Sequence, residues 1–264
     1  MDKPTLPVVR DRRAEVAVRA MTRGREARTG YRVRVSSTEA DVRAAQSLRF
    51  QVFNLELNEG LESSYATLRD EDPFDSVCDH LLVEEESTGE IVGTYRLQTG
   101  TMAMANLGFY SAQEFEFGAF RDVYGEMVEL GRACVHRSHR NLQVLTLLWR
   151  GIRDYARERG CRYLIGCSSL TSQDPRDGAA VYLELGPDYL VDARFRTHPT
   201  PQFVCPLDEV AGGVTRIPPL LRAYLSLGAR ICGAPALDGA FKTIDFLTWL
   251  DLETLPSAAR RILG

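Results

Sequence analysis

Long apolar runs are missing from this sequence of 264 residues. No stretch approaches the roughly 18 consecutive apolar residues that a membrane-spanning helix requires. The basic N-terminal region also lacks the apolar segment of a signal peptide. We therefore expect a cytoplasmic protein. With 44% hydrophobic residues, the chain can nevertheless bury the core of one large domain.

Metal-binding patterns are missing as well. The six cysteines form no Cys-x-x-Cys pair, and the four histidines are scattered along the chain. Three of the cysteines lie in or beside apolar stretches, which favours reduced thiols in the core over disulfides or a zinc site. The sequence therefore predicts no metal centre.

Acidic residues are scarce in one region only. Residues 1–35 carry ten Arg or Lys against four Asp or Glu, whereas the remainder carries twenty-two against thirty-two. We interpret residues 1–31 as a basic, flexible leader. A second interpretation stays open, in which Arg10 to Arg28 lie on an anionic surface, either phospholipid or an acidic carrier protein. We expect no nucleic-acid partner.

A buried strand, a polar turn, an amphipathic helix and a second buried strand are predicted between residues 128 and 168. Val128–Val135 and Cys161–Cys167 are short apolar runs. Between them, apolar residues from Val144 to Tyr155 are spaced three and four apart, as one helical face requires. In such a unit the first amides of the helix lie at the carboxyl end of the first strand and favour an anion. The turn is therefore a candidate phosphate cradle.

The other predicted elements also alternate between helix and strand. They are a helix over Ser36–Asn58 capped by Thr38 with Asp41 or by Ser36 with Glu39, a hairpin of His80–Glu85 and Glu90–Gln98, helices over Asp174–Gly186 and Ile217–Leu227, and a strand over Thr243–Leu252. No internal repeat and no second complete pattern is present. We expect an α/β (α+β) fold in one domain over residues 32–255, followed by a tail over residues 256–264.

Several charged residues stand out from these patterns. Arg49 and Phe53 share a stripe of the first helix, which on spacing alone is typical of a solvated face with an ion pair. Asp72 and Asp75 belong to an acidic corner around a proline, which is either a capped turn or a socket for a cationic group. Arg96 projects from the second strand of the hairpin.

The strand, turn, helix and strand unit, with the later helix ending Tyr182-Leu-Glu-Leu-Gly, resembles the acetyltransferase fold of the GNAT superfamily. This resemblance implies a central mixed, twisted sheet flanked by helices. It also implies that the pantetheine arm of an acyl thioester lies between two splayed central strands. In that superfamily a tyrosine on this helix often protonates the departing thiolate, so the resemblance suggests this role for Tyr182.

The turn departs from the superfamily's pattern. Its usual glycines let backbone amides approach the pyrophosphate of coenzyme A, whereas the matching stretch here, Arg137-Ser-His-Arg140-Asn141, has none. A side chain at position 140 obstructs close backbone approach but offers a cation. This suits the single phosphate of a carrier-protein phosphopantetheine better than a diphosphate. We therefore expect Arg137, Arg140 and Asn141 to bind phosphopantetheine.

A longer ordered series resembles two related families. The motifs LRFQVF, EDPFD, VGTYRL and ELGR follow, in order, the pattern of acyl-homoserine-lactone synthases, although Glu59 stands about where that family has a tryptophan. The stretches IPPLLRAYLSLGARICGAPALD and DFLTWLDL then resemble the ornithine-lipid N-acyltransferases, also grouped as hemolysin-like. The residues that carry the first four motifs, and that the resemblance assigns to substrate binding or catalysis, are Arg49, Phe53, Asp72, Asp75, Arg96, Glu129 and Arg132.

This resemblance implies an enzyme that transfers a 3-hydroxyacyl group from acyl carrier protein to the α-amine of ornithine, giving lyso-ornithine lipid. It implies acyl carrier protein and an amino acid as partners, an acyl-carrier thioester as donor and no bound cofactor. The amphiphilic product implies peripheral contact with the anionic inner face of the cytoplasmic membrane. Two alternatives stay open: an acyl-homoserine-lactone synthase that consumes S-adenosylmethionine, and a non-catalytic acyl-binding or membrane-active protein.

Aminolysis of a thioester needs a neutral amine and a polarised carbonyl. By resemblance, Glu129 would accept the proton of the amine, directly or through a water. Backbone N–H groups near Cys134 and Val135 would stabilise the oxyanion. Glu129 and Arg132 are three residues apart, which places them on opposite faces of a regular strand unless a bulge intervenes.

The three arginines have two open interpretations. Arg49, Arg96 and Arg132 either bind the carboxylate of the substrate or form a buried network with Asp72 and Asp75. The acidic pair, in turn, is a candidate for binding the side-chain ammonium of ornithine.

Overall fold

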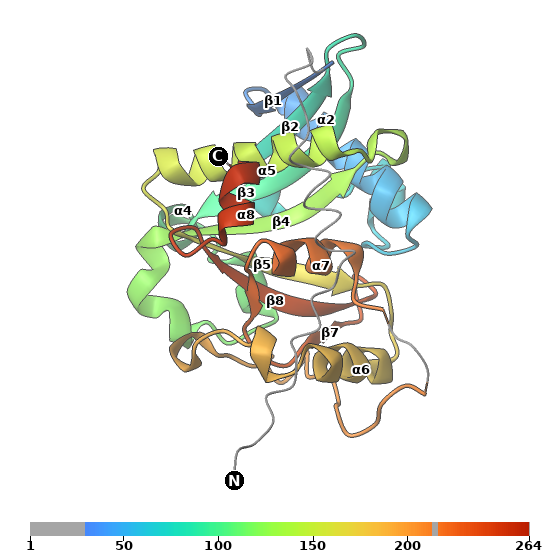
Figure 1. The fold of residues 1–264 in the computed structure, drawn as a ribbon. Coiled ribbons are helices and arrows are strands. Elements are labelled where there is room, and N and C mark those ends of the chain that lie inside the picture. Colours follow the sequence, from blue (N-terminus) through green and yellow to red (C-terminus); the bar gives the residue numbers. More distant parts are fainter. Residues whose placement is uncertain (1–29, 213–215, 264) are drawn as a thin grey trace.

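The computed structural model describes residues 30–212 and 216–263 of the chain, and Figure 1 shows its fold. The predicted leader lies outside the described residues, apart from positions 30 and 31. None of the described helices is both long enough and apolar enough to cross a bilayer.

Eight strands form one mixed sheet in the order β1-β2-β3-β4-β5-β8-β6, with β7 also paired to β8. Only β4 and β5 pair in parallel; the other pairs are antiparallel. The strands are β1 (Tyr31–Val35), β2 (Asp79–Glu85), β3 (Ile91–Thr99), β4 (Met127–Val135), β5 (Tyr163–Leu170), β6 (Arg230–Ile231), β7 (Ala236–Asp238) and β8 (Thr243–Asp251). The predicted mixed central sheet is confirmed.

Helices cover both faces of this sheet. In Figure 1, α5, α7 and α8 lie in front of it, and α2 lies behind β2 and β3. The helices are α2 (Glu39–Phe50), α3 (Ser64–Thr67), α4 (Gly100–Ala105), α5 (Leu142–Glu158), α6 (Pro175–Leu185), α7 (Pro219–Ser226) and α8 (Ser257–Leu263). The 3-10 turns are η2 (Pro73–Ser76), η3 (Tyr110–Gln113), η4 (Gly118–Glu126), η5 (Arg137–His139), η6 (Pro187–Tyr189) and η7 (Ala193–Phe195).

The two largest apolar cores follow from this layering. The front core holds the buried face of α5, including Leu148 and Ile152, together with Tyr224 of α7. The rear core is largely aromatic, with Phe120 stacked on Trp249 at 5.4 Å between ring centroids. The aromatic residues that precede β4 are therefore packed in this core; they are Phe109, Phe115, Phe117 and Phe120.

The first helix shows both a confirmed start and a revised end. The side chain of Thr38 accepts a hydrogen bond from the amide of Asp41, and Asp41 caps the amide of Thr38 in return. Regular α-helix ends at Phe50, and the chain continues as a π-helical segment, η1 (Gln51–Glu56). Arg49 and Phe53 are both buried, at 0% and 7% exposure, so the solvated face that their spacing suggested is wrong.

Both chain ends of the predicted domain need correction. The segment taken as a tail contains α8, and Ala259 in that helix is buried in the front core. Strand β1 begins at Tyr31, inside the segment taken as leader. Both elements are short. Charged residues lie among the few apolar residues that pack, so neither element has a clear apolar pattern in the sequence.

Candidate active site

The two parallel central strands part along their length. Hydrogen-bonded register between β4 and β5 runs only from Met127 and Tyr163 to Glu129 and Ile165, although β4 continues to Val135 and β5 to Leu170. Beyond Glu129 the backbone of β4 therefore has no ladder partner in β5. The predicted splay of the central strands is confirmed, and their ladder ends at Glu129.

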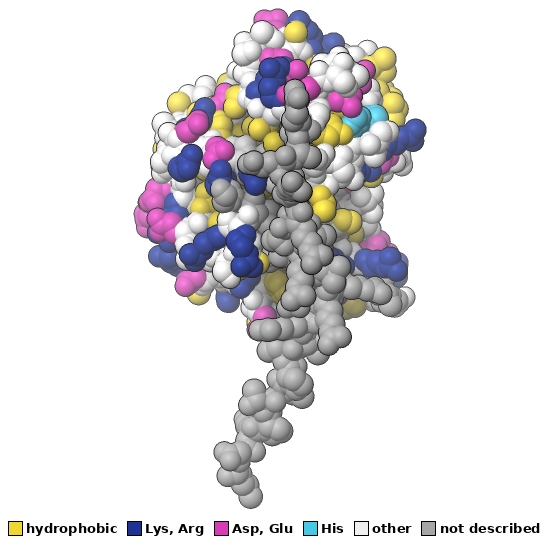
Figure 2. Space-filling view, turned by 45° about the horizontal axis from the view of Figure 1, so that its top comes forward, with side chains coloured by type: hydrophobic (Ala, Val, Ile, Leu, Met, Phe, Trp, Pro, Cys, Tyr) yellow, Lys and Arg dark blue, Asp and Glu magenta, His cyan; other side chains and the backbone are white. Residues whose placement is uncertain are grey.

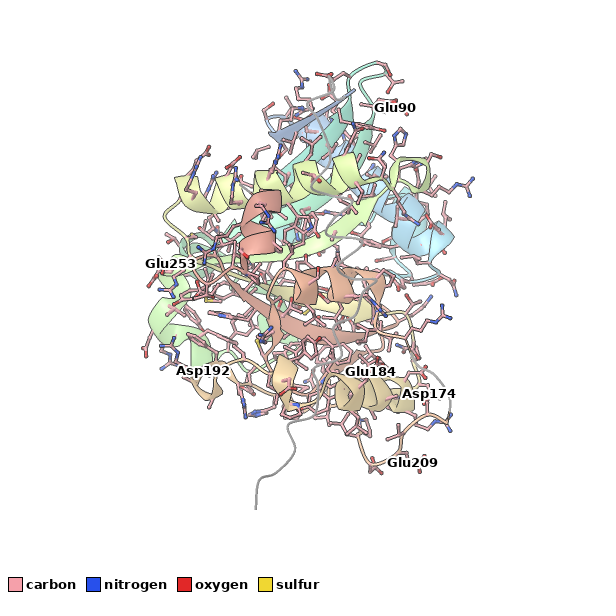
Figure 3. The ribbon with its side chains drawn as sticks, in the orientation of Figure 1. Glu90, Asp174, Glu184, Asp192, Glu209 and Glu253 are labelled. Carbon is pink, nitrogen blue, oxygen red and sulfur yellow. The ribbon has the colours of Figure 1, made fainter. Side chains whose placement is uncertain are left out.

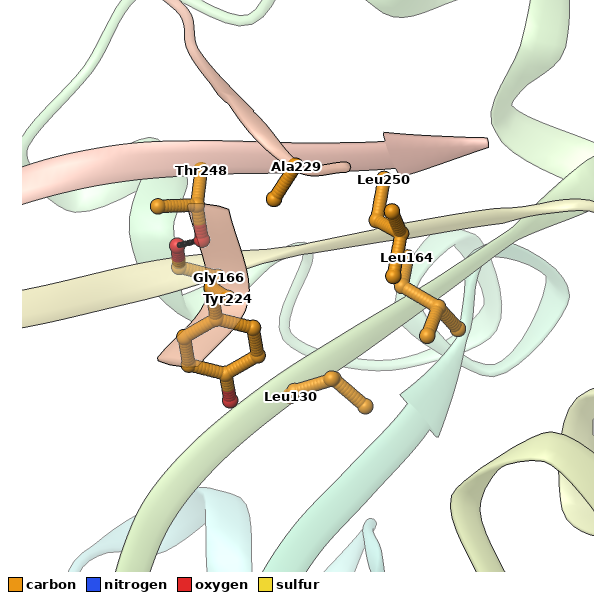
Figure 4. A pocket seen from close by; sticks show the side chains of 7 residues that line it. All are labelled: Leu130, Leu164, Gly166, Tyr224, Ala229, Thr248 and Leu250. Carbon is orange, nitrogen blue, oxygen red and sulfur yellow. Dashed lines mark hydrogen bonds between the residues drawn. The ribbon is translucent and has the colours of Figure 1, made fainter. Parts of the chain in front are cut away.

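The narrow end of this opening is filled by packed side chains. A cavity of about 10 Å³, roughly one water in size, is lined by Leu130, Leu164, Gly166, Tyr224, Ala229, Thr248 and Leu250 (Figure 4). A Cβ atom on Gly166 would lie 2.1 Å from the carbonyl oxygen of Leu130, so only glycine permits this approach. The two strands are therefore still in close contact at Leu130 and Gly166, although their ladder has ended at Glu129 and Ile165.

A β-bulge reshapes β4 at Arg132. The register between β3 and β4 shifts between Thr94 and Arg96, and Arg132 has a φ of 50°, which is unusual for a residue other than glycine. The bulge brings Glu129 and Arg132 to the same face of the sheet, where both lie beside Tyr110. An ion pair between them is not formed.

Backbone amides of β4 alternate between the two neighbouring strands. The amide of His136 bonds the carbonyl of Val92 in β3, at 2.8 Å. Alternation therefore directs the amide of Cys134 towards β3 and that of Val135 away from it, into the opening. The Val135 carbonyl, on the same side, accepts a hydrogen bond from Arg140 at 3.1 Å. Of the two expected oxyanion donors, only the Val135 amide faces the opening.

The turn after β4 satisfies many of its own amides. The Asn141 side chain caps α5 by accepting hydrogen bonds from the amides of Gln143 and Val144. The His136 side chain and carbonyl accept from the amides of Ser138 and His139. These amides are therefore not free to hold a diphosphate as a glycine-rich turn would. Asn141 acts as a helix cap, and its role in phosphopantetheine binding stays a prediction.

The basic side chains around this turn remain accessible. Arg140 forms a bidentate ion pair with Glu56, at 2.5 and 2.8 Å, and the pair is exposed. Arg137 and Arg150 are exposed, and neither forms an ion pair within residues 30–212 or 216–263. The mouth of the opening thus carries cations that a phosphate can reach, because a surface pair is easily exchanged.

Three arginines and three aspartates form a buried ion-pair network on the rear face. Arg49, which is 0% exposed, pairs with Asp70 and Asp75 at 2.8 and 2.6 Å. Arg96 pairs with Asp72 and Asp75 at 2.6 and 3.0 Å. Arg132 closes the network by pairing with Asp70 and Asp72, at 3.2 and 3.0 Å.

This network is electrically balanced. Burial alone would raise the pKa of Asp75, but Arg49 and Arg96 hold it well below its usual range. Three charges of each sign joined by direct contacts leave no unpaired cation for a substrate carboxylate. The second of the two interpretations of these arginines, a buried network with Asp72 and Asp75, is therefore the one the structure shows. The same contacts mean that Asp72 and Asp75 are not available to a substrate ammonium.

Glu129 lies beside this network and is held by three donors. Its Oε2 accepts from the amide of Tyr110 and the side chain of Gln98, at 2.7 and 2.6 Å, and its Oε1 accepts from the amide of Ser111 at 2.7 Å. The residue is 4% exposed. A carboxylate offers about four acceptor positions, so one position, on Oε1, is unused. A role as proton acceptor stays a prediction.

Two other predicted site residues lie apart from Glu129. Tyr182 packs at the edge of the apolar cluster between α6, α7 and β8, and its hydroxyl has no hydrogen bond within the described residues. Phe53 packs edge-to-face on Phe241, with 5.5 Å between ring centroids. The structure gives Phe53 a core role, and the proton-donor role of Tyr182 stays a prediction.

Cys134 is unsuited to act as a nucleophile. Burial raises the pKa of its thiol well above the usual range, and a thiol that stays protonated is a poor nucleophile. Within residues 30–212 and 216–263, all six cysteines are free thiols.

A second acidic group was missed by sequence reasoning. Carboxylate oxygens of Glu114, Asp238 and Asp245 lie within 4.8 Å of one another, and all three residues are buried. Burial, together with the charges of Asp245 and Asp238, raises the pKa of Glu114 well above its usual range. Positions so far apart in the chain, each with an ordinary neighbourhood, carry no local signal that could have grouped them.

Replacing Asp245 with Asn should remove a pH-dependent loss of stability. Burial raises the pKa of Asp245 from 3.8 to about 6, so the folded protein binds this proton more tightly than the unfolded chain. The stability it contributes is complete below about pH 4 and is lost as pH rises through about 6, a loss on the order of a few kcal/mol. Urea unfolding measures the free energy of unfolding of both proteins. The value for Asp245→Asn minus that for the wild type should therefore increase by this amount between pH 4 and pH 7. A flat difference would contradict the assignment.

The fold and the site together define a class of protein. A mixed sheet whose parallel central strands part, with a helix beginning at the mouth of the opening, is the architecture of a GNAT acyltransferase. The family described as "Acetyltransferase (GNAT) domain" matches residues 48–150.

Solved structures show the same fold. The acyl-homoserine-lactone synthase LasI has a TM-score of 0.50 and 13% identity, covering 88% of this chain and 94% of that chain. FeeM, an N-acyl amino acid synthase from uncultured soil microbes, has a TM-score of 0.51 and 12% identity, covering 85% and 91%. At these identities the likeness is one of fold alone.

Sequence relatives show the family. The L-ornithine N(alpha)-acyltransferase of Agrobacterium fabrum (strain C58) is 34% identical over 237 residues, covering 84% of this chain and 81% of that protein. The enzyme of the same name from Brucella abortus (strain 2308) is 34% identical over 245 residues, covering 85% of each. The chain therefore belongs to the L-ornithine N(alpha)-acyltransferase family, and it is an N-acyltransferase. The resemblance found in the sequence is confirmed.

Proposed function

We propose that this N-acyltransferase moves a 3-hydroxyacyl group from acyl carrier protein to the α-amine of L-ornithine, producing lyso-ornithine lipid for the membrane. The names of the relatives support ornithine as acceptor. The observation that carries the proposal is the opening between β4 and β5, because it begins at Glu129 and has basic side chains at its mouth. Contact with the inner membrane surface remains part of this proposal.

In the reaction one bond forms and another breaks. The α-nitrogen of ornithine attacks the thioester carbonyl, the C–N bond forms, and the C–S bond then breaks to release the pantetheine thiol. Glu129 takes the proton of the amine at the free position on Oε1 through intervening waters, because Val135 lies six residues further along β4. The amide of Val135 stabilises the oxyanion, and Tyr182 protonates the departing thiolate.

The ion-pair network suits this chemistry because its arginines position the residues around Glu129 and do not bind the substrate themselves. Arg132 lies over the rings of Tyr110 and Phe241, with 4.8 and 4.6 Å to their centroids. Tyr110 in turn donates its amide to Glu129. The network therefore fixes the segment that orients the carboxylate, which is a positioning role for Arg49, Arg96 and Arg132.

The donor should dock through single arginines. In Figure 2, acidic and basic side chains are interspersed over the visible face. Arg137 and Arg140 are exposed just before α5, and Arg150 is exposed halfway along it. A phosphopantetheine carries one phosphate, and an arginine fork can bind it through two hydrogen bonds.

Replacing Arg140 with Ala should raise the KM for acyl carrier protein by roughly tenfold and leave kcat nearly unchanged, as the loss of one charge-assisted contact predicts. Folding should not suffer, because the pair with Glu56 is exposed. Steady-state kinetics with varied acyl carrier protein measures the effect. Arg153→Ala, which removes a half-buried arginine of α5 paired with Asp154, is the control. Equal KM values for both variants would contradict the docking role.

A product assay tests the proposed function. Purified protein is incubated with 3-hydroxyacyl carrier protein or the matching coenzyme A thioester, with and without L-ornithine, and products are weighed by mass spectrometry. We expect N-acyl ornithine from the carrier-protein donor. A lactone that forms only with S-adenosylmethionine would instead identify a homoserine-lactone synthase. Binding or lysis of vesicles without any acyl transfer would instead indicate a non-catalytic acyl-binding or membrane-active protein.

A further inference from the structure

The rear face of the sheet carries more buried negative charge than the arginine network neutralises. Glu59, Glu114, Glu129, Asp238 and Asp245 are all buried, and none of them ion-pairs with Arg or Lys within the described residues. Arg132, whose charge acts on Glu114, already pairs with Asp70 and Asp72. Buried carboxylates without a partner are costly, so they hold protons or bind a cation.

The cluster of Glu114, Asp238 and Asp245 has an oxygen with no donor. Asp245 is 4% exposed, its Oδ2 accepts the hydroxyl of Thr243 at 3.0 Å, and its Oδ1 has no hydrogen-bond partner. Glu114 meets a weak donor, the thiol of Cys167 at 3.9 Å, and its carboxyl group also hydrogen-bonds that of Asp245. Asp238 differs, since its Oδ1 accepts the amides of Ala240 and Phe241.

This cluster adjoins the proposed site of amine attack. The amide of Ser111 bonds Glu129, and the hydroxyl of Ser111 accepts from the thiol of Cys167 at 3.5 Å. The same thiol reaches Glu114. Burial and the charges of Glu114, Asp245 and Glu129 raise the pKa of this thiol well above its usual range, so all three carboxylates surround it.

We propose that Glu114, Asp238 and Asp245 form the subsite that binds the side-chain ammonium of the acceptor amino acid. The inference rests on the proposed function and assigns it a specificity site. An ammonium group carries three donors. Hydrogen bonds of about 2.9 Å can join it to three oxygens within 4.8 Å of one another. An acceptor with its α-amine at Glu129 directs its side chain towards this cluster.

A comparison of acceptors in the wild-type enzyme tests the inference without any variant. L-Ornithine and L-norvaline have the same carbon skeleton, but norvaline lacks the ammonium. We expect kcat/KM for ornithine to exceed that for norvaline by roughly 10²-fold or more, because an unfilled site leaves buried polar groups unpaired. Equal values overturn the inference alone, whereas acylation of neither amino acid overturns the proposed function.

Variants of the cluster locate the effect. Asp245→Asn and Glu114→Gln should each lower kcat/KM for ornithine by roughly 10²-fold, with the value for norvaline within about threefold of wild type. Thermal unfolding verifies that each variant is folded, and two variants guard against the failure of one. The control is Glu184→Gln, an exposed carboxylate of α6 labelled in Figure 3. An unchanged preference for ornithine in both variants overturns the inference.

Calorimetry separates an ammonium from a metal ion. Ornithine should bind the wild-type protein and lose its affinity in Asp245→Asn, while Mg²⁺ and Ca²⁺ should give no saturable binding that depends on Asp245. Saturable metal binding that Asp245→Asn abolishes, with ornithine binding unaffected, would assign the cluster to a divalent cation and overturn the inference.

Discussion

Replacing Glu129 with Gln lowers kcat for acyl transfer by roughly 10² to 10⁴-fold, the usual contribution of a positioned general base. Glutamine cannot take the amine proton. It must also place its NH₂ group against the amide of Tyr110 or of Ser111, both of which now donate to the carboxylate. Single-turnover kinetics with acyl carrier protein and ornithine measures the loss.

The pH profile separates a base from a residue that only holds the loop. Without its base, the variant depends on amine that is already neutral, so its rate should rise about tenfold per pH unit below the pKa of the amine. Glu126→Gln, the same change at an exposed position beside β4, should leave the rate unchanged. Gln98→Met removes one hydrogen-bond donor to Glu129 but keeps the carboxylate, so it should lower the rate of acyl transfer much less. Parallel pH profiles for Glu129→Gln and wild type would contradict a role as base.

Replacing Arg49 with Met lowers the free energy of unfolding by about 3–5 kcal/mol, the cost of breaking a buried ion pair from one side. Asp70 and Asp75 would keep their charge in the interior without the guanidinium that contacts both. Urea unfolding, read from the midpoint with an unchanged slope, measures this loss.

Helix α2 supplies a matched control for this change. Arg43→Met removes another arginine of the same helix, paired with Glu39 at 3.1 Å but exposed to solvent. An exposed pair of this spacing contributes about 0.3–0.5 kcal/mol. Similar losses for the two variants would show that burial does not set the strength of the network. A stable but inactive Arg49→Met protein would instead point to a role in substrate binding.

Local patterns in the sequence predicted the elements that depend on local rules. Thr38 with Asp41 marked the start of α2, the spacing of Val144 to Tyr155 gave α5, and Asp174 with its following proline gave α6. Gly160, with a φ of +66°, ends the turn after α5, a position that favours glycine. The π-helical end of the first helix has no such signal, because it depends on how Val52 and Phe53 pack.

Only part of the candidate site could be predicted from the sequence. Motif order indicated that Arg49, Arg96 and Arg132 belong together, but spacing could not tell a substrate site from a buried network. That decision depends on Asp70, which pairs with two of the arginines. The sequence places Asp70 in the acidic corner with Asp72 and Asp75 but does not indicate these partners. The bulge at Arg132, where φ is +50°, was an open possibility in the sequence, and Gly131 inside the strand is typical of such a position.

The most direct test of the account follows the acyl group by intact mass. Purified enzyme, 3-hydroxyacyl carrier protein and L-ornithine are mixed, and the masses of enzyme, carrier and small product are recorded over time. The carrier should lose one acyl mass for each N-acyl ornithine formed, only when ornithine is present, while the mass of the enzyme stays constant. A carrier that stays acylated with ornithine present, or an enzyme that gains the acyl mass, would contradict direct attack of the amine on the thioester.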